Sequence, residues 1–151
     1  SMARFSVIKL ALINWRGSMF KFSSSSLKRL EGVNAPVMET MMLALSLSSI
    51  DFGIPEYGGL RTVQDQAALF TAGKSKCDGR INRSNHQSGD SVDVYAYTDK
   101  ASWEPEHLAL VAIYVLIAAN QLGHKCEWGG TWTKGDDLYG WDMPHFNITA
   151  R

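Results

Sequence analysis

The sequence of 151 residues has few cysteines, no excess of charge of either sign, and no long uninterrupted hydrophobic run. Cys77 and Cys126 are too few and too far apart for a disulfide framework or a CxxC zinc ribbon. We interpret them as reduced thiols, and a pairing between the two stays open. Fifteen basic and fifteen acidic side chains cancel, so the basic footprint of a nucleic-acid-binding protein is missing and we expect no nucleic-acid partner.

The apolar stretches are too short or too interrupted to act as membrane or targeting segments. A helix needs about 20 apolar residues to cross a bilayer. The run from Leu108 to Ala119 is shorter, which predicts a buried core helix and no stable membrane insertion. The apolar stretch near the N-terminus is broken by Lys9 and offers no clear cleavage site for a secretory signal. We interpret residues 1–18 as an extension, or as sequence extraneous to the natural product.

Residues 19–151 show no internal repeat and no proline-rich linker, which indicates one domain without a second binding module. A domain of this size buries most of its apolar surface around one core without a metal ion or a disulfide. A metal bound by this chain is therefore better explained by catalysis than by a structural role.

Hydrophobic periodicity predicts helices in the first part of the chain and short strands later. Because helices and strands do not alternate as in βαβ units, the expected class is α+β with a small, mainly antiparallel sheet. The predicted helices are a short one capped by Ser26 and running through Glu31, then 35–48, 63–72 and 102–122, the last capped by Ser102; the predicted strands are 91–97, 125–128 and 145–149; residues 74–89 are predicted to be loop.

Two short segments, SNHQSGDSVD and WDMPHF, hold the side chains of a possible catalytic metal site. Zinc binds imidazole and carboxylate groups, and a catalytic zinc keeps one tetrahedral position open for water. His86, Asp93 and His145 supply two imidazoles and one carboxylate. The remaining carboxylate, Asp142, is then available for proton transfer.

The expected elements can bring these residues together. The alternation over residues 91–97 predicts that Asp93 projects from a strand, while His86 lies in the preceding loop and can fold back toward it. Pro144 is tolerated at the start of a strand, which places His145 on a second strand beside the first. Both segments would then face the same cleft.

Each of these residues also has an ordinary structural explanation. A histidine is more often a surface or hydrogen-bonded core residue than a ligand, and spacing alone leaves both explanations open for His86, Asp93 and His145. We do not expect His107 or His124 to bind metal. Other acidic residues are interpreted as solvated loop carboxylates: Asp90, Asp99, Asp136 and Asp137.

Several ordered motifs resemble those of one known group of enzymes. The chain is similar to the M15 zinc peptidases, specifically the L-alanyl-D-glutamate endopeptidases found as bacteriophage endolysins and bacterial wall hydrolases. The resemblance covers roughly residues 19–149 and implies a hedgehog/DD-peptidase-like single domain. Its motifs are FKFSxxSLxRLEGV at 20–33, GLRTxxxQxxLxxxGKS at 59–75, SxHxxGxxxD at 84–93, WGGxW at 128–132 and DxPHF at 142–146.

The resemblance implies roles for particular residues. His86, Asp93 and His145 match the family's zinc ligands, and Asp142 matches its general base. The arginine of GLRT, Arg61, would face the cleft and stabilise the oxyanion that forms during amide hydrolysis. A surface salt bridge is the alternative explanation for Arg61, and Gln66 in the same motif is a weaker candidate.

The chain departs from the family pattern beside one proposed ligand. The family often has GHAVD where this chain has GDSVD, so Asp90 and Ser91 replace residues near Asp93. A small residue remains at position 91, and we expect strand packing to survive. Three basic residues of the preceding loop are either solvated or attract carboxylates of the substrate: Lys76, Arg80 and Arg83.

The activity implied by the resemblance is hydrolysis of the L-alanyl-D-glutamate bond in the peptidoglycan stem peptide. One alternative is a D-alanyl-D-alanine dipeptidase or carboxypeptidase, and another is a catalytically silent domain that binds zinc or wall peptide. A phage lysin of this kind would be made in the host bacterial cytoplasm and reach the wall after another protein breaches the membrane. We expect it to be a monomer.

Overall fold

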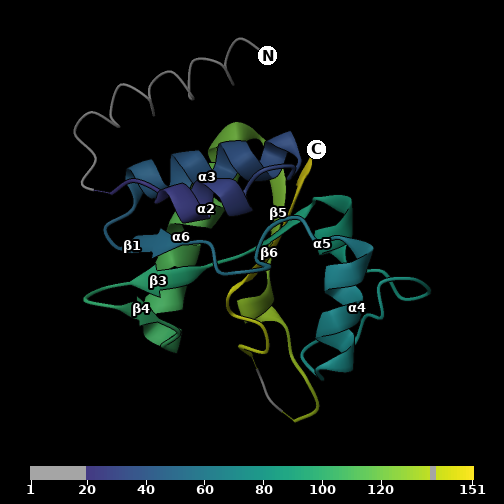
Figure 1. Ribbon diagram of the computed structural model, residues 1–151. Coiled ribbons are helices and arrows are strands. Elements are labelled where there is room, and N and C mark those ends of the chain that lie inside the picture. Colours follow the sequence, from purple (N-terminus) through teal and green to yellow (C-terminus); the bar gives the residue numbers. More distant parts are fainter. Residues whose placement is uncertain (1–19, 137–138) are drawn as a thin grey trace.

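The computed structural model describes residues 20–136 and 139–151, and it shows helices packed around two small antiparallel sheets (Figure 1). The predicted α+β class is confirmed, but the prediction of one sheet is wrong, since the strands form two sheets of three strands each. Residues 1–18, interpreted as an extension, lie outside the described residues. The elements are α2 Ser24–Arg29, α3 Ala35–Leu47, β1 Asp51–Gly53, α4 Val63–Thr71, α5 Asn85–Ser88, β2 Ser91–Asp93, β3 Tyr95–Tyr97, β4 Ala101–Ser102, α6 Pro105–Leu122, β5 His124–Trp128, the 3-10 helix η2 Gly129–Thr131, and β6 His145–Ala150.

The chain passes from one sheet to the other at Val94. Strands β1, β3 and β4 form the first sheet, and β2, β6 and β5 form the second, in that order. The segment predicted as one strand over 91–97 is therefore two, with Val94 donating its N–H to the carbonyl of Pro144 at 3.0 Å. Buried and less buried residues alternate through the break. Because period two continues across both strands, the pattern could not reveal the change of sheet.

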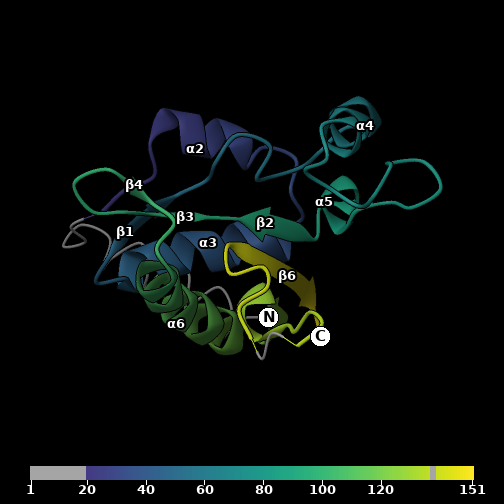
Figure 2. The ribbon, with the colours of Figure 1, turned by 90° about the horizontal axis from the view of Figure 1, so that it is seen from below.

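The core lies where α3 and α6 pack on each other and against the strands. In Figure 2 the strands β1, β2 and β3 run between α2 and α4 on one side and α3 and α6 on the other, and α5 lies at the end of β2. Val37 and Met41 of α3, Val111 and Val115 of α6, and Phe146 of β6 are fully buried. Each such side chain contributes about 1.5–3 kcal/mol by burial, so this layer holds β6 and the residues at its start in place.

Helix α6 is long and apolar enough to cross a bilayer by length and composition. One of its faces, however, includes buried residues such as Val111 and Ala118, and the helix packs against α3 and β5. This packing agrees with the predicted buried core helix. Its place in the fold thus explains the apolar residues of the buried face, whereas Leu110, Ile113 and Ile117 of the same helix are exposed.

Two helices begin at residues other than those predicted. Ser23, rather than Ser26, caps α2 by accepting the N–H of Ser26. Ser26 is buried, and its hydroxyl accepts the N–H of Ile54 at 3.0 Å. Helix α6 begins at Pro105 after the cap residue Glu104, while Ser102 belongs to β4. Proline lacks an N–H and suits the first helical position, which explains the later start.

Candidate metal centre and active site

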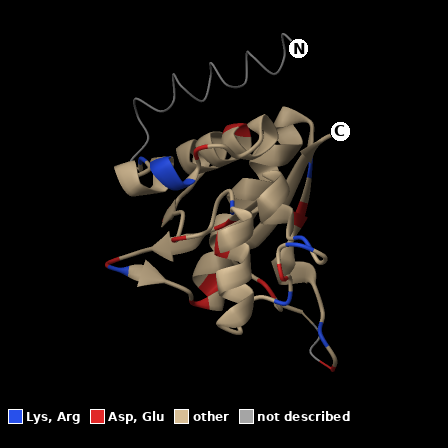
Figure 3. Cartoon of the chain, turned by 45° about the vertical axis from the view of Figure 1, so that its right-hand side comes forward, with Lys and Arg blue, Asp and Glu red and all other residues tan. Residues whose placement is uncertain are grey.

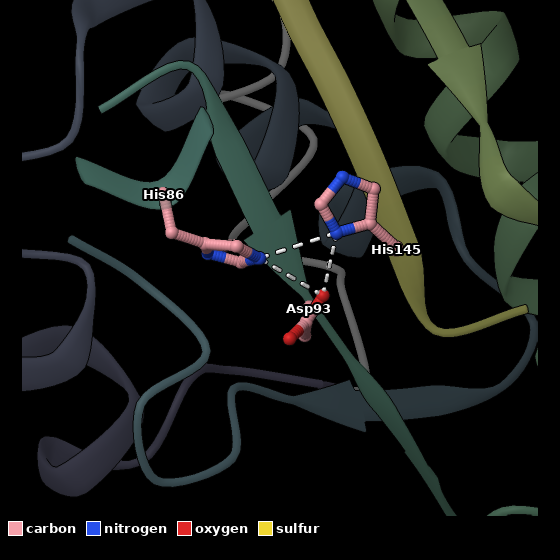
Figure 4. A group of neighbouring side chains, drawn as sticks. All are labelled: His86, Asp93 and His145. Carbon is pink, nitrogen blue, oxygen red and sulfur yellow. Dashed lines mark hydrogen bonds and ion pairs between the residues drawn. The ribbon is translucent and has the colours of Figure 1, made fainter. Parts of the chain in front are cut away.

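Three of the predicted site residues converge at the junction of α5, β2 and β6. Figure 4 shows the side chains of His86, Asp93 and His145 pointing toward one another. Asp93 ends β2 and His145 begins β6, and the two are direct partners in the antiparallel register. Paired residues of neighbouring strands hold their side chains close together on one face. The pairing of β2 with β6 thus joins residues that are 52 positions apart.

Helix α5 positions the third member of the group. Residues 85–88 were predicted to be loop, but they form one helical turn that carries His86. Ser84 and Gln87 form a capping box. The Ser84 hydroxyl accepts a backbone N–H of the helical turn, and the side-chain oxygen of Gln87 accepts the backbone N–H of Ser84 at 2.9 Å. Gly89 then ends the helix in the left-handed conformation, at φ 83°. The S-x-x-Q pattern was visible in the sequence, but the helix is too short to show a periodicity.

The three side chains offer ligand atoms that lie within 4.8 Å of one another. The Nδ1 atom of His145 lies 3.0 Å from Oδ1 of Asp93, and Nε2 of His86 lies 3.3 Å from the same oxygen. The two ring nitrogens are 3.2 Å apart. All three side chains are largely buried, with Asp93 the most accessible at 21% exposure. The group is therefore a possible metal-binding site that remains open on one side.

Hydrogen bonds on the far side of each ring decide which nitrogen faces the centre. The carbonyl of Gly59 accepts from Nδ1 of His86 at 3.0 Å, which leaves Nε2 with a free lone pair. Oδ1 of Asn147 accepts from Nε2 of His145 at 2.7 Å, so in the neutral ring the lone pair lies on Nδ1, which faces Asp93; a protonated His145 donates from this Nδ1 to Asp93 instead. Such outer hydrogen bonds are a regular feature of metal-ligating histidines. The donor set and its orientation fit a metal ion.

Asn147 itself is held by Ser91, one of the two residues at which the chain departs from the family pattern. The hydroxyl of Ser91 donates to Oδ1 of Asn147, opposite it in the β2–β6 register. Ser91 is fully buried. Neither Asn147 nor Gly59 belongs to the residues predicted for the site. Asn147 lies two residues after His145 on the same strand face, which is the one signal that could have found it.

Electrostatics keep the Asp93 carboxylate ionised. Burial alone would raise the pKa of Asp93, but hydrogen bonds from His145 and His86 outweigh it and hold that pKa well below its usual range. Burial lowers the pKa of His145, whereas its hydrogen bond to Asp93 raises it, and the net direction is upward. A metal ion that binds here therefore competes with a proton on His145.

Arg61 lies beside this group and is fixed from three directions. Its Nη2 forms an ion pair with Oδ2 of Asp93 at 3.1 Å, and its Nε donates to the carbonyl of Tyr57 at 2.8 Å. Its Nη1 donates to Oε1 of Gln66 at 3.2 Å. Gln66 is completely buried and is held in turn by Ser75 and by a backbone carbonyl. Arg61 is thus a rigid cation at the site, and Gln66 positions it.

Asp142 lines the same cleft, which has a volume of about 510 Å³, together with Arg61 and the three possible ligands. It is outside the group of possible ligands. Burial raises its pKa, the positive His145 opposes this, and the negative Asp93 adds to it. The backbone of Asp142 approaches Gly129 so closely that a Cβ at that glycine would lie 2.1 Å from the Asp142 carbonyl oxygen. The lack of a side chain at Gly129, in the WGGxW motif, therefore lets the segment that carries Asp142 pack against it.

The remaining candidates lie elsewhere. His124 contacts Glu39 at 2.8 Å, and His107 contacts the Ser102 hydroxyl at 2.7 Å. Asp90 accepts a hydrogen bond from Asn34 rather than being purely solvated. Cys77 and Cys126 are both free, in agreement with the predicted reduced thiols. Asp99 and Asp136 are exposed, and Asp137 lies outside the described residues.

An α+β domain with two histidines and one aspartate at the base of an open cleft is typical of metal-dependent hydrolases. Comparison with known proteins narrows this class. Residues 18–148 match the family described as phage L-alanyl-D-glutamate peptidase. The chain belongs to this family, which confirms the resemblance found in its motifs.

Two relatives agree with this assignment. The L-alanyl-D-glutamate peptidase of Escherichia phage T5 is 31% identical over 122 residues, which cover 80% of this chain and 87% of the relative. The crystal structure of the Serratia marcescens L-Ala D-Glu endopeptidase ChiX superimposes with a TM-score of 0.69 at 34% identity. That comparison covers 86% of this chain and 90% of ChiX.

Proposed function

We propose that this protein is a zinc-dependent peptidoglycan hydrolase, an endolysin that cleaves the L-alanyl-D-glutamate bond of the stem peptide. The main support for the peptidase activity, and for the L-alanyl-D-glutamate bond as its target, is family membership over residues 18–148. The convergence of His86, Asp93 and His145 supports the metal dependence. The substrate is the peptide of the bacterial cell wall, in keeping with the names of both relatives.

His86, Asp93 and His145 would hold the zinc ion. Neutral imidazole and carboxylate are groups that zinc binds well, and three protein ligands leave a position open for catalysis. When bound, zinc supplies Lewis acidity that makes water a usable nucleophile near neutral pH. The hydrogen bonds that the two histidines donate to the Gly59 carbonyl and to Oδ1 of Asn147 support this proposal, because they leave the lone pair of each neutral ring on its inward-facing nitrogen.

Asp142 and Arg61 would carry out the remaining chemistry. The Asp142 carboxylate accepts a proton from the attacking water and then donates it to the amine that leaves when the amide bond breaks. Its raised pKa suits a group that must both accept and return a proton. The Arg61 guanidinium, held by Tyr57 and Gln66, stabilises the negative charge that develops on the substrate carbonyl oxygen.

The role of Asp142 is tested by replacing it. We expect Asp142→Ala to fold and to bind zinc but to lose wall-lytic activity by about 100- to 10,000-fold, the contribution of a general base. Asp99→Ala, an exposed carboxylate in the β3–β4 turn, is the matched control and keeps full activity. Turbidity loss of isolated cell walls measures both. Full activity in Asp142→Ala would remove this residue from the mechanism.

Mass analysis of the released fragments tests which bond of the stem peptide is cleaved. Cleavage after L-alanine leaves that residue on the muramic acid. A carboxypeptidase releases D-alanine from the other end of the peptide, and a D-alanyl-D-alanine dipeptidase splits the free dipeptide and leaves the stem peptide uncut. A silent domain that only binds zinc or wall peptide releases nothing. The intact Asp142 argues against the silent domain.

We further propose where and in what form the enzyme works. By its similarity to phage lysins it is made in the host cytoplasm and reaches the wall after the membrane has been breached. We propose that residues 19–151 form the catalytic domain and that this domain is a monomer without nucleic-acid partners or stable membrane insertion. Light scattering on the purified chain measures the oligomeric state.

A further inference from the structure

The wall of the active-site cleft carries a group of cations that the proposed mechanism does not use. Lys74 and Lys76 follow α4, and Lys134 lies in the segment between η2 and β6; all three line the cleft. Trp141, which lines it as well, is about half exposed. Residues from two distant parts of the sequence thus line the same cleft as the possible metal ligands.

Two of these lysines share one aromatic ring. The Nζ atom of Lys76 lies 5.6 Å from the centroid of the Trp141 ring, and Nζ of Lys134 lies 5.2 Å from it. Ammonium groups at this distance are attracted to the electron-rich face of an indole. The Trp141 ring therefore holds two positive charges beside each other in the cleft, although like charges repel. A negative group bound between them would relieve that repulsion.

The charge of the cleft differs from that of the whole chain. Figure 3 shows basic and acidic positions interspersed along the chain, which has no net charge. The cleft contains four cationic side chains and only two carboxylates, Asp93 and Asp142. Asp93 is already paired with Arg61. Among the described residues, no carboxylate forms an ion pair with any of the three lysines.

We propose that Lys76, Lys134 and the ring of Trp141 form a subsite that binds a free carboxylate of the stem peptide. This inference rests on the proposed function. In the stem peptide D-glutamate is linked onward through its side chain, so its α-carboxylate stays free next to the bond that is cleaved. A diaminopimelate at the third position carries a second free carboxylate. A lysine ammonium suits such a ligand because it is a mobile point charge with three donors.

The subsite makes the enzyme sensitive to amidation of its substrate. Three synthetic stem peptides separate the sources of the carboxylate: one with D-glutamate and lysine at the third position, its α-carboxamide analogue, and one with D-glutamate and diaminopimelate. We expect the wild type to prefer a free carboxylate by about tenfold in kcat/KM, through KM, because two exposed cations each contribute modestly. The preference weakens at high salt.

The test variant is Lys76→Met together with Lys134→Met, which removes both charges and keeps the length of the side chains. Lys100→Met, an exposed lysine in the β3–β4 turn that does not line the cleft, is the matched control. The double variant should lose the preference, and the loss should appear in KM for the peptides with a free carboxylate. If the double variant no longer distinguishes the first peptide from its carboxamide analogue, the subsite binds the α-carboxylate of D-glutamate. If it instead loses a preference for the third peptide, the subsite binds the second carboxylate of diaminopimelate.

Calorimetry with Asp142→Ala variants measures the affinity for the three peptides without cleaving them. Equal preferences in the wild type and the double variant, in kinetics and in binding, would overturn the subsite and leave the proposed function intact. Cleavage of none of the peptides by the wild type would instead overturn the proposed function, and the binding preference would still decide the subsite.

Discussion

At the scale of single residues, the site depends on atoms that lie outside the ligand set. His86 presents Nε2 to the centre and His145 presents Nδ1, so the two rings use different nitrogens. The choice is made by the acceptors on their far sides, Gly59 and Asn147. A histidine whose outer nitrogen lacks a partner can rotate or change tautomer, which weakens a metal site.

The acceptor on Asn147 can therefore be tested separately from the ligands. We expect Asn147→Ala to lower zinc affinity by about 10- to 100-fold, because the ring of His145 loses the group that orients it. Asn120→Ala, near the end of α6, is the matched control and leaves the affinity unchanged. Competition with a chromophoric chelator measures both. Equal affinity in Asn147→Ala and the wild type would show that the ring is oriented without this bond.

At the scale of elements, a four-residue helix and one strand pairing place the whole ligand set. The register of β2 with β6 sets Asp93 opposite His145, and α5 brings His86 to them. A helix this short has no stability of its own. Its capping box and its contacts with β2 hold it in place.

Removing the cap should loosen that helix. We expect Ser84→Ala to lower the free energy of unfolding by about 1 kcal/mol, the usual cost of losing an N-cap, and to reduce activity by misplacing His86. Ser84→Thr keeps the hydroxyl and is the matched control. Chemical denaturation measures the stability, and wall lysis measures the activity. If Ser84→Ala matched Ser84→Thr in both, the capping box would not position His86.

At the scale of the whole molecule, the site joins the two sheets and the helical core. β2 and β6 carry two of the possible ligands, Val94 links β2 to the other sheet, and Phe146, next to His145, is buried in the core. A ligand that binds only the folded state stabilises it. Metal binding should therefore be visible as stability of the whole domain.

Zinc removal tests this coupling. At a zinc concentration 100 times its Kd we expect a gain of about 2.7 kcal/mol over the chelated protein, measured as a higher Tm. Asp142→Ala should keep the gain and His145→Ala should lose it, because Asp142 is not a proposed ligand. The gain should also shrink as the pH falls through the raised pKa of His145, since zinc must then displace a proton. A Tm that does not respond to zinc at any pH would contradict the proposed site.

Local patterns in the sequence determined the class of the fold, the helices α3, α4 and α6, the strands β5 and β6, and the motifs that name the family. These features depend on residues that are close together in the sequence, so the spacing of apolar residues and the residues at helix ends are enough to predict them. The break between β2 and β3 was hidden because alternation continues through Val94.

Only the tertiary structure decided which groups surround those motifs. The carbonyl of Gly59 orients His86 from 27 residues away, and Lys76 and Lys134 meet over Trp141 from separate loops. A backbone carbonyl leaves no mark in the sequence, since every residue has one. Contacts between distant segments arise from packing of the whole core, so no local pattern could predict them.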